Sequence, residues 1–213
     1  MDVVLLGHGS RRGKDTDVGL RDVERRLQSR LNGTKVRMAG FEFTPPTLEE
    51  AVLDLVREGE RSIVVMPFFL FDGKHVKIEI PQELERLRSL LPDTRLVYAR
   101  TLGIDPRLVQ MVKERVEKAL GQNRDRSAKA TGVIIVTRGT PLQYGSVEGL
   151  YKLAASVSAT YNGEMRVEPA QAQFGQPTIE SAVKSLAVWG AKLVAVVPYL
   201  LFPGKVLYDN ILP

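Results

Sequence analysis

Several residue types and patterns are scarce in this chain, and each absence narrows what the protein can do. The sequence has no cysteine and only two histidines. Disulfide bonds, thiolate nucleophiles and thiolate metal sites are therefore excluded, and any metal ion must be held by histidine, carboxylate or backbone oxygen. Long apolar runs are missing too: SIVVMPFFLF (62–71) is far shorter than the roughly 18 residues that span a bilayer. No signal-peptide pattern opens the chain, so we expect a cytoplasmic protein.

Excess charge of one sign is also small. The net charge is +5 over 213 residues, and the basic residues are spread along helix-like segments. No basic stripe interleaved with aromatic residues is present, so nucleic acid is not the expected partner. A modest positive field instead favours a small anionic ligand.

Apolar runs alternate with amphipathic segments along the first part of the chain, which predicts an α/β fold with a parallel sheet and helices on both faces. Predicted strands cover 3–6, 35–43, 62–70 and 95–100. The predicted helices are a segment with Leu20, Val23, Leu27 and Leu31 on one face, then 47–59, Pro81 to about Leu91, and 105–120.

Capping residues support two of these helices. Thr47 with Glu50 three residues later forms a capping-box pattern. Asp105 followed by Pro106 supplies an N-cap and a first-turn proline.

The second part of the chain repeats the first. PPTLEEAV (45–52) is matched by QPTIESAV (176–183), and PFFLFDGK (67–74) by PYLLFPGK (198–205), each pair 131 positions apart. A repeat of this length predicts two similar domains rather than a solenoid. The polar stretch between them lacks apolar periodicity and is typical of a linker.

The expected organisation is therefore an N-terminal lobe over 1–121, a linker over 122–131 and a repeat lobe over 132–213. The second copy lacks the last helix, strand and helix of the first, so we expect an incomplete second lobe.

Comparing the copies isolates three ionisable residues at or just after the carboxyl ends of predicted strands, the edge where open α/β sheets bind ligands. The first copy has His8, Glu42 and His75. With one residue of slippage at the first position, the second copy has Arg138, Gln173 and Val206 there. The repeated scaffold therefore keeps its turns but loses these groups.

Two imidazoles and a carboxylate suit Co²⁺, Fe²⁺, Ni²⁺ or Zn²⁺ and leave coordination positions open for a substrate. A histidine also titrates near neutral pH and accepts protons. We predict that His8, His75 and Glu42 are catalytic and that the two histidines bind the metal. The alternatives are that the histidines are ordinary loop residues and that Glu42 is the polar face of an edge strand.

Polar residues near these positions indicate binding of an anionic substrate. Ser10 either caps the following helix or contacts the substrate. The basic side chains are either solvated or bind carboxylates, and those predicted to bind are Arg11, Arg12, Lys74 and Arg138.

Three segments together resemble the CbiX/SirB family of sirohydrochlorin chelatases: LLGHGSR (5–11), FEFTPPTLEEA (41–51) and PFFLFDGKHVKIEIP (67–81). The resemblance implies a duplicated, chelatase-like, flavodoxin-like fold with one active lobe and the tetrapyrrole between the lobes. It implies a class II chelatase, a lyase, that acts in cobalamin or sirohaem biosynthesis. Glu79 is a departure, because the family usually has aspartate before the Ile-Pro pair.

The partners implied by the resemblance are a sirohydrochlorin-type tetrapyrrole and a divalent metal substrate, Co²⁺ or Fe²⁺ with Ni²⁺ as a further candidate. No cofactor is permanently bound, and the chain is expected to act as a monomer or homodimer. By matching position, His8 and His75 are the metal-binding and catalytic histidines and Glu42 an assisting carboxylate. A non-catalytic metal or tetrapyrrole carrier is the alternative function. A domain that binds a phosphorylated ligand is disfavoured, because the phosphate-cradling glycine motifs are absent.

Overall fold

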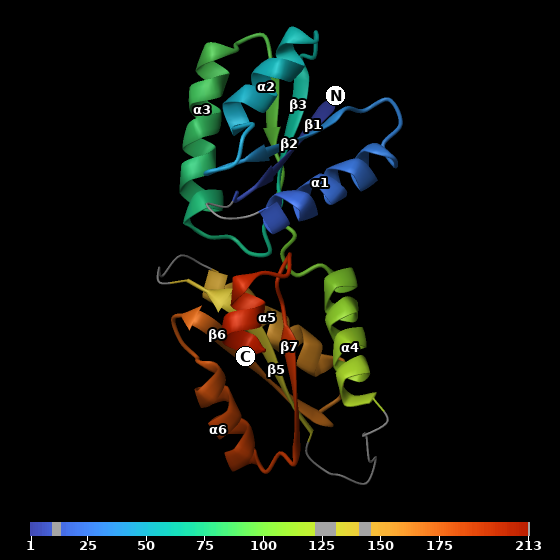
Figure 1. The fold of residues 1–213 in the computed structure, drawn as a ribbon, viewed down its shortest axis with the longest axis vertical. Coiled ribbons are helices and arrows are strands. Elements are labelled where there is room, and N and C mark those ends of the chain that lie inside the picture. The colour runs from blue at the N-terminus through green and yellow to red at the C-terminus, as the bar shows by residue number, and fades with distance from the viewer. Residues whose placement is uncertain (10–13, 122–130, 141–145, 213) are drawn as a thin grey trace. The chain divides into compact units, whose positions relative to one another are not determined.

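The computed structural model describes residues 1–9, 14–121, 131–140 and 146–212, and the chain divides into two compact units (Figure 1). Unit 1 is Met1–Gly103 and unit 2 is Ile104–Pro213. Each unit has a parallel sheet flanked by helices, which confirms the predicted α/β class with two similar lobes. No helix in the described ranges is long and apolar enough to cross a membrane.

The sheet of unit 1 has four parallel strands in the order β2-β1-β3-β4. Their bounds are β1 Asp2–Gly7, β2 Val36–Gly40, β3 Ser62–Pro67 and β4 Arg95–Tyr98. β1 is central, and its Val4, Leu5 and Leu6 are buried because helices cover both faces of the sheet. The predicted strands are confirmed, although β2, β3 and β4 end earlier than the sequence pattern suggests.

The helices of unit 1 are α1 Lys14–Gln28, α2 Leu48–Arg57 and α3 Ile80–Leu90, with a π-helix, η1 His75–Glu79, directly before α3. The capping box at α2 is confirmed: Glu50 N donates to Thr47 Oγ1 at 3.2 Å, and Thr47 N donates to Glu50 Oε2 at 2.7 Å. The prediction for Leu31 is wrong, because this residue lies beyond α1 and is 37% exposed.

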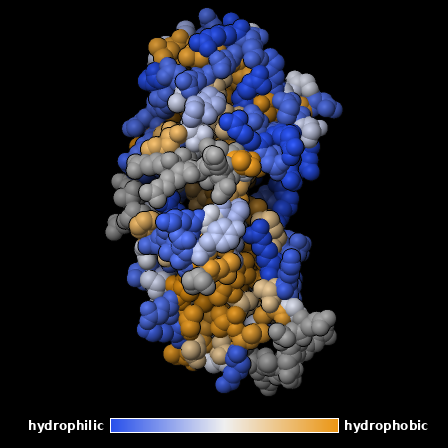
Figure 2. Space-filling model, in the orientation of Figure 1, coloured by the Kyte–Doolittle hydropathy of each residue, from blue (hydrophilic) through white to orange (hydrophobic). Residues whose placement is uncertain are grey.

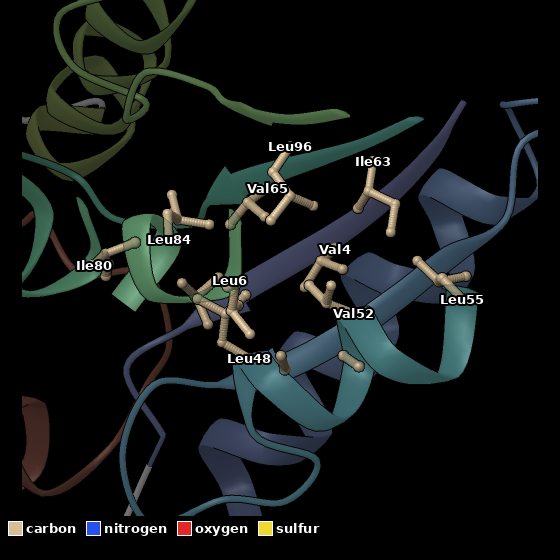
Figure 3. Close-up of a cluster of buried hydrophobic side chains, with 13 residues drawn as sticks. Val4, Leu6, Leu48, Val52, Leu55, Ile63, Val65, Ile80, Leu84 and Leu96 are labelled. Carbon is tan, nitrogen blue, oxygen red and sulfur yellow. The ribbon is translucent and has the colours of Figure 1, made fainter. Parts of the chain in front are cut away.

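One apolar core joins α2 and α3 to a face of the unit 1 sheet (Figure 3). Its side chains come from all four strands and from the two helices, and each is at most 5% exposed. The labelled members are Val4, Leu6, Leu48, Val52, Leu55, Ile63, Val65, Ile80, Leu84 and Leu96. Because this core holds β1 and β3 in register, it also fixes the loops that follow them.

Unit 2 has a three-stranded parallel sheet in the order β6-β5-β7. Its elements are α4 Pro106–Leu120, β5 Thr131–Gly139, α5 Ser146–Ala159, β6 Met165–Phe174, α6 Ile179–Trp189, β7 Leu193–Pro198 and a second π-helix, η3 Val206–Ile211.

Helix α4 packs on the sheet of unit 2. Its apolar stripe includes Val112 and Val116, both fully buried, and Arg115 Nη1 lies 3.4 Å from the carbonyl oxygen of Pro198 in β7. The division between the units therefore falls before α4, whereas the sequence pattern placed it after this helix. Residues 122–130 of the predicted linker lie outside the described residues.

Equivalent backbone contacts confirm the internal duplication. Gly40 N donates to Pro46 O at 2.9 Å, and Gln171 N donates to Pro177 O at 2.8 Å, 131 positions further along. The π-helices η1 and η3 occupy matching positions after the third and seventh strands. Both copies thus fold alike from the second strand to the π-helix.

The units differ in how well helices cover their sheets. Val65 in β3 is fully buried beneath α2 and α3, whereas its counterpart Val196 in β7 is 38% exposed. The described part of unit 2 contains no helix in the position of α3. Figure 2 accordingly shows hydrophobic surface gathered over unit 2.

We expect Leu55→Ala to lower the free energy of unfolding of unit 1 by about 2–5 kcal/mol, because the fully buried side chain leaves a cavity between α2 and β1. Leu90→Ala is the matched control: Leu90 is 57% exposed at the end of α3, and its loss should change stability by less than about 0.5 kcal/mol. Native-state hydrogen exchange of the β1 and β3 amides measures both. Equal effects of the two variants would show that this core does not hold the sheet together.

Candidate active site

The chain's two histidines lie next to each other at the carboxyl edge of the unit 1 sheet. His8 directly follows β1, and His75 is the first residue of η1, which begins after the loop that leaves β3. Their ring centroids are 4.9 Å apart and the ring planes are 88° to each other. The His75 side chain is 30% exposed, so the pair is accessible from solvent.

The backbone after β1 brings His8 close to the end of β2. Glu42 N donates to His8 O at 2.8 Å, and the His8 imidazole Nδ1 lies 3.3 Å from Gly9 O. Gly9 has a φ of +84°, and a Cβ added there would overlap the carbonyl oxygen of Glu42. Glycine is therefore required at this position, because any side chain would push the two loops apart.

A carboxylate orients the second histidine. His75 Nδ1 hydrogen-bonds Glu79 Oε2, and Lys74 Nζ forms an ion pair with Glu79 Oε1 at 2.5 Å. When Nδ1–H donates to the carboxylate, Nε2 carries the free lone pair, and the imidazole is held in one orientation as a ligand. The Lys74 ammonium first, and His75 after it, hold the pKa of Glu79 below its usual range, so this carboxyl stays ionised.

The π-helix that carries His75 continues into α3 and is anchored to β4. Ile80 N–H bonds to His75 O, five residues back, immediately before Pro81, which has no N–H to donate. Tyr98 OH donates to Val76 O at 3.0 Å. Burial, and the nearby Asp72 carboxylate after it, raise the pKa of Tyr98 to about 12, so its hydroxyl remains a donor.

A phenylalanine ring lies beside each imidazole. Phe69 lies 6.4 Å from His8 and Phe41 lies 5.3 Å from His75, measured between ring centroids. Phe43, in the same turn as Glu42, has a φ of +59° and is 49% exposed. A non-glycine residue in this conformation is strained, and such strain is concentrated at functional sites. The surroundings suit a large, flat, partly apolar ligand.

The other predicted site residues are placed as follows. Glu42 lies two residues beyond the end of β2, so it is not on the face of a strand. Lys74 forms an ion pair with Glu79, and Arg138 lies in β5 of unit 2. Ser10, Arg11 and Arg12 are outside the described residues. Among the residues that are described, no group of three histidine and acidic side chains is arranged to hold a metal ion.

Sequence reasoning missed the roles of Glu79, Phe41 and Phe69. The spacing of Glu79 four residues after His75 is the signal that was available, because such residues share a helix face. The sequence predicts a helix that starts at Pro81, which places His75 and Glu79 in a loop. In the structure, helical hydrogen bonding starts at η1, which contains both residues.

The fold and site define a class: α/β proteins of two similar parallel-sheet units, with paired imidazoles at the carboxyl edge of one sheet. The CbiX family model matches residues 2–119 and 132–212. The chain therefore belongs to the CbiX family, as its motifs indicate.

Two relatives from Priestia megaterium align with nearly the whole chain. A sirohydrochlorin cobaltochelatase is 27% identical over 206 residues, which cover 96% of this chain and 65% of the relative's length. A sirohydrochlorin ferrochelatase is 26% identical over 212 residues, which cover 98% of this chain and 76% of the relative. The solved structure of SirB from Bacillus subtilis with Fe3+ covers 98% of this chain and 81% of its own, with a TM-score of 0.80 at 23% identity. That likeness supports the fold.

We expect Lys74→Ala to raise the pKa of Glu79 toward its usual range, because the ammonium is the largest cause of the lowered value. A lowered pKa in the folded state means that the stabilisation from this carboxylate is fully present above the ordinary glutamate pKa. It is lost as the pH falls through the folded-state value. The carboxyl ¹³C shift of Glu79, followed by NMR from pH 7 downward, measures this pKa in both proteins. An unchanged midpoint would contradict the assigned role of Lys74.

Proposed function

We propose that this protein inserts Co²⁺ or Fe²⁺ into sirohydrochlorin. The observation that carries the proposal is the pair of facing imidazoles, His8 and His75, at the ligand-binding edge of a sheet in a CbiX-family chain. The names of the two Priestia megaterium relatives support the substrate class.

Metal insertion makes two chemical demands. The catalyst must present a partly desolvated cation to one face of the macrocycle, and it must accept the two protons that leave the pyrrole nitrogens. Imidazole nitrogen meets both demands, because it binds divalent transition metals and titrates near neutral pH. His8 and His75 hold the incoming metal, and one of them or Glu42 accepts protons.

Glu79 acts through His75. Its carboxylate accepts the Nδ1–H hydrogen bond, which directs Nε2 away from Glu79 and makes it more electron-rich. Lys74 in turn keeps Glu79 ionised. This chain of contacts makes Glu79 a positioning residue for the metal-binding histidine.

The aromatic residues beside the imidazoles provide an apolar surface for the macrocycle. Phe41 and Phe69 lower the local polarity around the rings, and Phe43 offers an exposed face against which a flat tetrapyrrole packs. Exclusion of water at this surface strengthens the interaction between the metal and the imidazoles.

The donor atoms do not select one metal. Imidazole nitrogen and carboxylate oxygen bind Co²⁺ and Fe²⁺ in the general affinity order, and cells choose between such metals largely by availability. The relatives include both a cobaltochelatase and a ferrochelatase. The proposal therefore covers both metals and both pathways, cobalamin and sirohaem.

We expect His8→Ala and His75→Ala each to lower kcat by at least about 100-fold, because each removes a ligand or base from the reaction. Absorbance changes of sirohydrochlorin on addition of Co²⁺ or Fe²⁺ measure the rate. Arg25→Ala is the control. The Arg25 side chain is 80% exposed on α1. This helix ends beside the start of β2, where Gln28 Oε1 accepts a hydrogen bond from Val36 N. Arg25 therefore lies toward the edge of the sheet opposite the one that carries the histidines.

Normal turnover by either histidine variant would contradict the proposal. A wild-type protein that binds metal and tetrapyrrole but releases no metallated product over many turnovers would instead be a carrier. A multiple-turnover assay with substrate in large excess over protein separates these outcomes.

A further inference from the structure

The loop 68–74 leads from β3 to His75, and the segment 98–103, at the end of unit 1, holds this loop. Two backbone hydrogen bonds join the first half of the loop to the segment: Leu102 N donates to Phe69 O at 3.0 Å, and Gly103 N donates to Leu70 O at 2.9 Å. The second half of the loop, next to the histidine, is joined to the same segment by a pair of side chains.

A hydroxyl and a carboxylate make this second contact. Thr101 Oγ1 donates to Asp72 Oδ1 at 2.8 Å, and Asp72 lies three residues before His75. Thr101 is 8% exposed, so the donor is fixed in the interior of unit 1, whereas Asp72 is exposed. Just after the histidine, Tyr98 OH donates to Val76 O. Side-chain hydrogen bonds from one segment therefore hold the chain on both sides of the imidazole.

The charge of Asp72 strengthens its contact with the segment. Aspartate is ionised near neutral pH, and hydrogen bonds to a carboxylate are roughly twice as strong as those between neutral groups. The same charge acts on Tyr98, where it adds to the effect of burial in raising the pKa of the hydroxyl. Asp72 thus interacts with both side-chain donors of the segment.

The duplication separates the residues of this loop into two kinds. Unit 2 has the equivalent loop 131 positions further along the chain, between β7 and η3. The turn residues are retained, because Phe71, Gly73 and Lys74 correspond to Phe202, Gly204 and Lys205. Asp72 and His75 are both replaced, by Pro203 and Val206. The carboxylate is therefore lost together with the imidazole.

The loop of unit 2 shows what the carboxylate is not needed for. The side chain of Pro203 has no atom that accepts a hydrogen bond. The loop nevertheless leads into a π-helix, η3, as the loop of unit 1 leads into η1. The turn and the π-helix thus form without a carboxylate at this position, so its presence in unit 1 is tied to the histidine rather than to the fold.

We infer that Asp72 is a positioning residue for metal insertion: its contact with Thr101 fixes the loop 68–74 so that the imidazole of His75 faces that of His8. This role rests on the proposed function, because it concerns the side chains that hold the metal. The two ring centroids are 4.9 Å apart, and both rings bind one ion only while the loop keeps them together. Without the contact, the loop samples a wider range of positions and the imidazoles separate for part of the time.

The test is the Kd for Co²⁺ alone, measured by calorimetry on the full chain. We expect Asp72→Ala and Thr101→Val each to raise this Kd by about 10-fold, as loss of a group that orients a metal ligand does. The double variant should bind no more weakly than either single variant, because both changes remove the same contact. Asp72→Asn and Thr101→Ser should restore binding, because an amide oxygen still accepts and a serine hydroxyl still donates.

Thr94→Val is the matched control. Thr94 is 7% exposed, but it precedes β4 whereas Thr101 follows it, so the two threonines lie at opposite edges of the sheet. We expect Thr94→Val to leave the Kd for Co²⁺ unchanged even where it lowers Tm. A Thr101→Val protein that loses stability but binds Co²⁺ as tightly as Thr94→Val does would overturn the positioning role.

A direct metal ligand gives a different pattern. If Asp72 itself bound Co²⁺, Asp72→Asn would weaken binding as much as Asp72→Ala, and Thr101→Val would have no effect. That pattern would also overturn the positioning role.

Failure of this inference is distinguishable from failure of the proposed function. Wild type that inserts metal, with no effect of Asp72→Ala or Thr101→Val on the Kd for Co²⁺, contradicts the positioning role alone. Wild type that binds Co²⁺ and shows the expected losses, but never inserts the metal into sirohydrochlorin, contradicts the catalytic proposal alone. Absence of Co²⁺ binding by wild type contradicts both.

Discussion

The register between β1 and β3 is the constraint on which the site depends. Leu6 pairs with Pro67, and Phe68 N donates to Leu6 O at 2.8 Å, so the two strands end side by side. The loops that follow then bring two residues distant in sequence, His8 and His75, to 4.9 Å between ring centroids. Because a one-residue slip in a strand exchanges its two faces, the core beneath α2 and α3 protects this register. Packing far from the histidines therefore decides whether they can act together.

Duplication shows which features belong to the fold and which to the chemistry. Both units keep the turn after the second strand, the π-helix after the third, and a glycine with positive φ where the first strand ends, at Gly9 and Gly139. The backbone at this edge is thus conserved between the copies while the side chains on it have diverged. An orienting contact also survives in altered form: Glu79 hydrogen-bonds His75, and Asn210 hydrogen-bonds Gln173. One scaffold supports a pair of imidazoles in one unit and a cationic group in the other.

Much of this could be predicted from the sequence, because local signals specify local structure. Apolar runs identified the strands, Thr47 with Glu50 identified the start of α2, and the internal repeat singled out the histidines. Tertiary contacts are what the sequence pattern could not supply. The partnership of His75 with Glu79 depends on a π-helix that begins before Pro81, and the ring contacts of Phe41 and Phe69 depend on loops from different strands. The packing of α4 on unit 2 likewise depends on which sheet has an uncovered apolar face, which periodicity does not reveal.

The central claim is that the two imidazoles bind one metal ion. X-ray absorption spectroscopy of the protein loaded with one equivalent of Co²⁺ tests it most directly, because imidazole rings give a distinct scattering pattern around the metal. We expect two imidazole ligands on cobalt in wild type and one in either single-alanine variant. A cobalt shell of oxygen atoms alone, or one unchanged when His8 or His75 is removed, would contradict it.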